Sequence, residues 1–63
     1  MKKRICIYAK DIQLITGRSE RYAYKIIAKI KRIKGKRNDQ LITIKEFAEF
    51  SGIDEQQIRE LVS

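Results

Sequence analysis

The fold is decided by the stretch GRSERYAYKIIAKIKRIKG, residues 17–35. Its apolar side chains recur every three or four residues, which places them on one stripe of an α-helix. They are Ala23, Ile26, Ile27, Ile30 and Ile33. Ser19 is a favourable N-cap and Gly35 a favourable terminator, so the spacing predicts a helix over residues 19–34.

The same pattern occurs twice in the chain, 35 residues apart. Ile7–Ile12 aligns with Ile42–Phe47, and Ile15-Thr16-Gly17 aligns with Phe50-Ser51-Gly52. Each copy predicts a helix, a tight turn at glycine and a second helix. We therefore expect an all-α fold in one domain, residues 1–63, built from two tandem helix-turn-helix-like units. We call residues 7–34 the basic unit and residues 42–62 the acidic unit.

Four helices are expected, near residues 9–16, 19–34, 44–51 and 54–62. Asp11 favours the first turn of its helix, and Thr43 with Glu46 has the spacing of a capping box. The apolar periodicity predicts a core of ten residues. These are Ile12, Ile15, Ala23, Ile26, Ile27, Ile30, Phe47, Phe50, Ile58 and Leu61. Two β-like runs, residues 5–8 and 41–44, are expected to form at most a minor two-stranded ribbon.

Composition excludes several classes of protein. With one Cys and no His, we expect no metal site, no cofactor and no enzyme, because few groups could ligate or catalyse. The longest uncharged run is six residues, and no apolar stretch follows the Met-Lys-Lys-Arg start, so we expect neither a membrane span nor a signal peptide. A cytoplasmic protein is expected, with Cys6 as a small buried side chain.

Charge divides the chain into two halves. Residues 1–38 carry thirteen Lys and Arg against two acids, whereas residues 39–63 carry two against six. The whole chain has a net charge of +7. One half is suited to phosphate and the other would be repelled by it, so we expect nucleic acid as the partner.

The polar face of the 19–34 helix is centred on Arg21, Lys25, Ala28 and Arg32, at 100° per residue. No acid occurs between Arg21 and Arg37. Such a face suits the major groove, with Arg21 at a guanine edge, the lysines and Arg32 at phosphates, and the small Ala28 allowing close approach. The predicted DNA-binding residues are Arg18, Ser19, Arg21, Tyr22, Tyr24, Lys25, Ala28, Lys29, Arg32, Lys36 and Arg37.

A family resemblance points the same way. Ala9–Ile12 with Gly17–Ile27 resembles the helix-turn-helix of small phage and mobile-element regulators, including excisionase-like and MerR-like domains. Ile42–Ala48 with Ser51-Gly52-Ile53 is similar to the opening of that pattern. The resemblance implies sequence-specific binding to double-stranded DNA, as a transcriptional regulator or a recombination accessory factor. By motif the acidic unit is the better match, because it has Ala48 and Ile53 where the basic unit has Gln13 and Arg18.

Charge nevertheless favours the basic unit, since Asp54, Glu55 and Glu60 would repel phosphate. A single inserted helix contacts only a few base pairs, so we expect a homodimer or a larger protein–DNA assembly. Two alternatives remain. The acidic helices would dock a protein partner if Phe47 and Phe50 were exposed, and the basic helix would bind RNA. Glu46, Glu49 and Glu60 are expected to form a solvated face rather than a carboxylate cluster.

Overall fold

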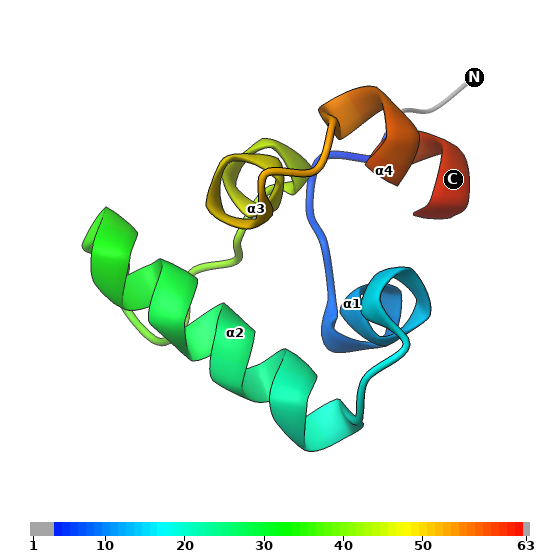
Figure 1. The fold of residues 1–63 in the computed structure, drawn as a ribbon. Helices are drawn as coiled ribbons and strands as arrows, with labels where there is room; N and C mark the ends of the chain where they lie inside the picture. The colour runs from blue at the N-terminus through cyan, green and yellow to red at the C-terminus, as the bar shows by residue number, and fades with distance from the viewer. Residues whose placement is uncertain (1–3, 63) are drawn as a thin grey trace.

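The computed structural model describes residues 4–62 and contains four helices in sequence (Figure 1). They are α1 (Ala9–Thr16), α2 (Glu20–Lys34), α3 (Ile44–Ser51) and α4 (Glu55–Val62). The all-α prediction is confirmed, and each boundary agrees within one residue, because Ser19 and Asp54 cap their helices from outside. Lys2 and Lys3, which contribute to the basic half, lie outside the described residues.

The two units begin their first helices in the same way. The Asp11 carboxylate accepts a hydrogen bond from the Tyr8 amide at 2.9 Å, and the Glu46 carboxylate accepts one from the Thr43 amide at 2.9 Å. Thr43 returns the interaction through its hydroxyl, which accepts from the Glu46 amide at 3.0 Å and completes the capping box. Each acid satisfies an amide that the helix leaves without a partner.

The two units also turn in the same way. Gly17 and Gly52 end α1 and α3 in the left-handed region, with φ of 70° and 77°. Their amides donate to the carbonyls four residues earlier, at 2.8 and 2.9 Å. Glycine is required because a Cβ is strained at this φ. Ser19 and Asp54 then cap α2 and α4 by accepting from the amides of Tyr22 and Gln57.

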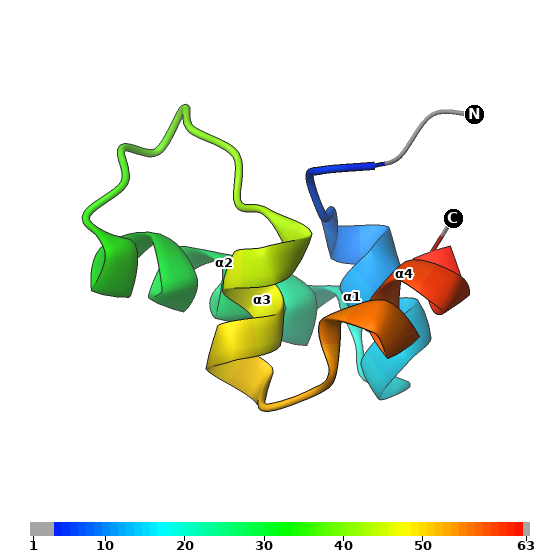
Figure 2. The ribbon, with the colours of Figure 1, turned by 90° about the horizontal axis from the view of Figure 1, so that it is seen from above.

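A short antiparallel bridge ties the units together. The Ile7 amide donates to the Ile42 carbonyl at 3.1 Å, and the Ile44 amide donates to the Ile5 carbonyl at 2.8 Å. Cys6, free and half-buried, lies opposite Thr43. The segments leading into α1 and α3 therefore lie on one side of the helices, as Figure 2 shows. The minor ribbon is reduced to this one bridge among residues 4–62.

The core lies where the four helices meet. Helices α1 and α3 each pack on both α2 and α4. Five of the predicted core residues are buried, namely Ile12, Ala23, Ile30, Phe47 and Ile58. Four more, Ile15, Ile26, Ile27 and Phe50, are half-buried and pack against them. The bridge adds Ile7, Ile42 and Ile44, which were assigned to β-like runs and not to the core.

Two apolar residues of α2 and α4 are exposed, and one of them was wrongly predicted in the core. Leu61 was predicted in the core but is 53% exposed, because α4 faces the core through Ile58 and Val62, four residues apart. Ile33 belongs to the predicted apolar stripe of α2 but not to the predicted core, and it is 61% exposed. It lies in the last turn of α2, one turn beyond the buried Ile30, where the neighbouring helix covers α2 less completely. Both side chains leave apolar surface open to solvent.

Candidate nucleic-acid interface

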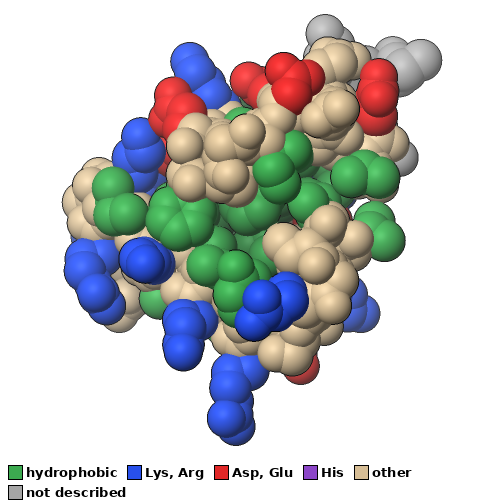
Figure 3. All heavy atoms as spheres, viewed as in Figure 1, with side chains coloured by type: hydrophobic (Ala, Val, Ile, Leu, Met, Phe, Trp, Pro, Cys, Tyr) green, Lys and Arg blue, Asp and Glu red, His purple; other side chains and the backbone are tan. Residues whose placement is uncertain are grey.

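The outward face of α2 presents cations to solvent. Arg21, Lys25, Lys29 and Arg32 are all exposed, and so is the small Ala28 among them. Ala23 and Ile30 turn the opposite side of the helix into the core. In Figure 3 the Lys and Arg side chains gather along the side of the molecule formed by α2. The helix therefore carries a continuous basic face, which we call the basic face and define by Arg21, Lys25, Lys29 and Arg32.

These four cations have no carboxylate partner among the described residues. Lys29 also lies over an aromatic ring, with its Nζ 5.9 Å from the centre of Phe50. An unpaired cation keeps its full attraction for an external anion. The basic face is therefore available for a polyanion without breaking an internal ion pair.

Two further cations of the predicted DNA-binding set make ion pairs within the molecule. Lys36 pairs with Glu46 at 2.9 Å and also donates to the Leu41 carbonyl. Arg37 pairs with Asp39 at 3.2 Å on the surface of the loop. Both belong to the predicted DNA-binding set, and the structure assigns Lys36 to holding the loop against α3. Arg37 remains exposed, and a surface pair of this kind is weak.

The C-terminal turn of α2 also contacts the following loop and α3. Lys31 donates to the Asn38 carbonyl at 2.7 Å, and Lys34 pairs with Glu49 at 2.9 Å. The hydrogen bond that Lys34 donates to the Glu49 carboxylate raises the pKa of Lys34 above its ordinary value, so this lysine stays charged. These contacts hold the loop and α3 against the end of α2, while Arg32 in the same last turn remains exposed.

The N-terminal end of α2 holds three predicted residues in defined positions. The Ser19 hydroxyl accepts from the Tyr22 amide at 3.2 Å, so it is used as the helix cap. The Arg18 guanidinium lies over the Tyr22 ring, 4.3 Å from its centre. This stacking leaves the edge of the guanidinium free to donate while fixing its plane. Tyr22 is half-buried, whereas Tyr24 is exposed on the other flank of α2.

The acidic unit presents no comparable face. Glu46 and Glu49 are paired with Lys36 and Lys34, and Glu60 is exposed. In the part of the chain that the structure describes, no group of three His, Cys, Asp or Glu side chains could hold a metal ion. Phe47 is buried and Phe50 is half-buried against the core, so neither forms the exposed anchor that protein docking through these aromatic residues would need.

Two arginines form a network that the sequence does not predict. Arg4 donates to the Asp11 carboxylate, at 3.1 Å from its Nη1, and to the Val62 carbonyl at 2.7 Å. Arg59 pairs with Glu55 at 2.8 Å and donates to the Arg4 carbonyl at 2.6 Å. Partial burial opposes ionisation of Asp11, but the bonds from Arg4 and Tyr8 outweigh it and lower the pKa of this carboxyl. Both arginines therefore serve the fold.

No helix in residues 4–62 has the length and apolar content needed to cross a membrane. Comparison with protein-family models, curated proteins and solved structures gives no match to this chain. The resemblance to excisionase-like and MerR-like domains therefore stays a prediction, and the geometry of α2 has to support any functional assignment.

Proposed function

We propose that this protein binds double-stranded DNA sequence-specifically through the basic face of α2. The observation that carries the proposal is the set of four exposed cations on one helix face, without carboxylate partners in residues 4–62. The proposed role is binding and not catalysis, as a transcriptional regulator or a recombination accessory factor of the excisionase-like or MerR-like kind.

The length of α2 suits insertion into the major groove. Its 15 residues span roughly 22 Å at 1.5 Å per residue, so it can cross a groove about 12 Å wide and still reach phosphates. Arg21, in the first turn, is proposed to donate to a guanine edge through both arms of its guanidinium. Lys25, Lys29 and Arg32 are proposed to contact phosphates and set the register of the helix.

Ala28 and Arg18 support this arrangement. Ala28 lies among the cations and is exposed, so the helix can approach the bases without a large side chain in the way. Arg18 is fixed by its stack on Tyr22 at the entrance to the helix, which is a suitable place for a backbone phosphate. Two carboxylates of the neighbouring α3, those of Glu46 and Glu49, are paired with Lys36 and Lys34, which reduces their repulsion of phosphate.

The proposal is tested by binding measurements across a salt series. Fluorescence anisotropy should show a preference for duplex DNA over single-stranded DNA and double-stranded RNA. If about five phosphates are neutralised, log K should fall against log salt with a slope near −4 to −5. An association with DNA that does not change with salt would exclude the basic face as the contact surface. Equal or tighter binding to double-stranded RNA would favour RNA as the ligand.

A further inference from the structure

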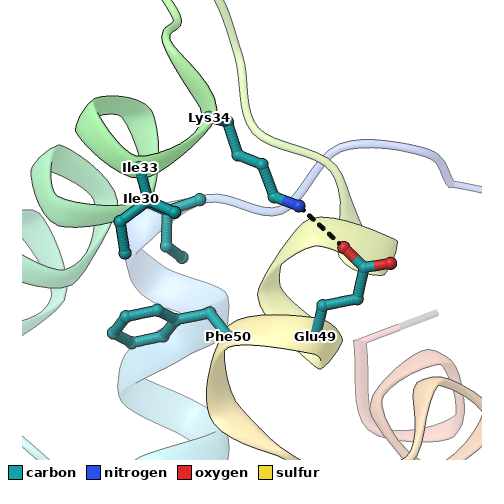
Figure 4. A pocket seen from close by; sticks show the side chains of 5 residues that line it. All are labelled: Ile30, Ile33, Lys34, Glu49 and Phe50. Carbon is teal, nitrogen blue, oxygen red and sulfur yellow. Dashed lines mark hydrogen bonds and ion pairs between the residues drawn. The ribbon is translucent and has the colours of Figure 1, made fainter.

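One face of the molecule is lined by apolar side chains from all four helices. Three shallow hollows follow one another across it. The first, shown in Figure 4, lies between α2 and α3, where the Phe50 ring extends toward Ile30 and Ile33. The second shares Phe50 and continues to Ile53, and the third shares Ile53 and continues to Leu61. The hollows are therefore continuous, and we call this surface the apolar face.

The apolar face leaves large side chains open to water. Ile33 is 61% exposed and Leu61 is 53% exposed, while Phe50 and Ile53 are half-buried. Figure 3 shows a continuous area of hydrophobic side chains in the middle of this view. Exposed apolar surface costs about 25 cal/mol per Å², and a surface of this kind commonly marks an interaction site.

Opposite charges border the apolar face on its two sides. On the α2 side, Lys29 lies over the Phe50 ring, and on the α4 side, Glu60 lines the hollow beside Leu61. Of the five acids in residues 44–62, Glu46, Glu49 and Glu55 are paired within the molecule, which leaves Asp54 and Glu60 on the acidic side without an ion pair among the described residues. In Figure 3 the cations lie along α2 and the acids along the opposite border.

We propose that a second copy of this chain docks on the apolar face. The two-fold axis would lie in the face, between α2 and the acidic unit and roughly along α2. Rotation about this axis places α2 of one copy opposite α3 and α4 of the other, so the cationic border meets the acidic border on both sides. An axis at right angles to it would bring like charges together. The charge pattern thus selects both the partner and the orientation.

If α2 binds DNA as proposed above, this pairing also determines how the dimer holds DNA. Lys29 is the one residue of the basic face that borders the contact. Arg21, Lys25 and Arg32 lie outside it, and the two-fold axis turns these residues of the two copies in opposite directions. One pair would therefore hold two duplexes, or two separate segments of one duplex. A dimer that reads adjacent half-sites would instead need both helices on one side.

The pairing is tested by sedimentation equilibrium of the whole chain without DNA, at low salt. Leu61→Glu and Ile33→Glu should each weaken self-association about 100-fold or more, because a charge is buried twice in a symmetric contact. The matched controls are substitutions at exposed apolar residues outside the apolar face, one in the loop after α2 and one before α1. Leu41→Glu, at a residue 53% exposed, and Ile5→Glu, at one 67% exposed, should leave self-association unchanged.

A charge exchange tests the orientation. Lys29→Glu and Glu60→Lys should each weaken self-association about 2- to 30-fold, since each change acts twice in the pair. The double variant should restore it, because the two borders are then exchanged. A double variant weaker than either single one would overturn the orientation. A wild-type chain that stays monomeric at millimolar concentration would overturn the pairing, while leaving DNA binding by α2 to its own test.

Discussion

The basic and acidic units share one backbone plan and differ in what they present outside. Residues 35 positions apart cap the same helices and occupy the same places in the core: Ile12 corresponds to Phe47, and Ala23 to Ile58, all buried. On the outer face of the second helices, Arg21 corresponds to Gln56 and Lys25 to Glu60, all exposed. The buried positions of the two units thus carry apolar side chains in both, whereas the exposed positions carry different charges.

The second helices of the two units also differ in length. Helix α2 has 15 residues and α4 has eight. The additional turns of α2 carry Lys29, Lys31, Arg32 and Lys34, and these turns also receive the loop and α3. In these additional turns Lys29 and Arg32 remain exposed, while Lys31 and Lys34 are held by the loop and α3.

The largest expected effect comes from the equivalent core residues Ile12 and Phe47. Ile12→Ala should cost about 2–5 kcal/mol and Phe47→Ala about 3–5 kcal/mol, because each empties a fully packed site. Since both units share one core, each variant should unfold the whole domain in a single transition, measured by circular dichroism in urea. Two separate transitions would show that the units fold independently.

The next largest effect is expected on DNA affinity, when Arg21 and its equivalent Gln56 are each replaced. Arg21→Ala should weaken binding to a preferred DNA site by about 1–3 kcal/mol and relax its sequence preference, because a bidentate base contact is lost. Gln56→Ala is the matched control and should leave the affinity unchanged in the same anisotropy assay. If Gln56, Gln57 or Arg59 carried the specificity and Arg21 did not, the acidic unit would contain the recognition helix.

The third prediction concerns acid stability, for which Asp11 and Glu46 are equivalent. Burial opposes ionisation of both, but hydrogen bonds from Arg4 to Asp11, and from Thr43 and Lys36 to Glu46, lower the pKa of each carboxyl in the folded state. Their stabilisation is complete above the unfolded pKa, near 4, and is lost as pH falls through the folded pKa. Unfolding free energies measured from pH 7 to pH 2 should therefore decline below about pH 4.

Substitution identifies the groups responsible for this decline. Asp11→Asn and Glu46→Gln should each cost about 1–2 kcal/mol at pH 7 and make the decline in acid shallower. Glu20→Gln is the control, because Glu20 is exposed on α2 and should not change the acid profile. An unaltered decline in both test variants would assign the acid sensitivity to other carboxylates.

The smallest effect is expected on DNA affinity and its salt dependence, when Lys25 and its equivalent Glu60 are each replaced. Lys25→Gln should weaken binding to all DNA sequences alike and make the salt slope shallower by about one unit. Glu60→Gln should leave DNA binding unchanged or slightly tighter, because it removes a charge that repels phosphate. Equal losses in the two variants, measured on the same duplex, would remove the functional distinction between the units.

Local patterns account for most of the fold that could be predicted. Ser19, Asp54 and the left-handed glycines act within four residues, so the sequence indicates where helices begin and end. The spacing of Ala23 and Ile30 likewise places the buried side of α2. The outward direction of Arg21 and Lys25 follows from the same periodicity, and the structure presents both side chains to solvent as predicted.

Long-range contacts account for what could not be predicted. Lys36 differs from Lys25 only in its surroundings, and no local pattern shows that Glu46 pairs with it. Arg4 reaches the carbonyl of Val62, a separation of 58 residues. The burial of Ile7 and Ile42 depends on the bridge between the units, and the exposure of Ile33 depends on how far α3 covers α2. These outcomes follow from packing in three dimensions.

The bridge between the units also sets an order for folding on the ribosome. The basic unit is synthesised first, but the Ile7 amide lacks its partner until Ile42 emerges, and Arg4 can bind Asp11 before Val62 is present. Until then, Ile12 and Ile30 lack the covering side chains of α3 and α4. The basic unit therefore leaves the exit tunnel with its apolar side exposed, and this side is covered only when α3 and α4 of the acidic unit pack against it.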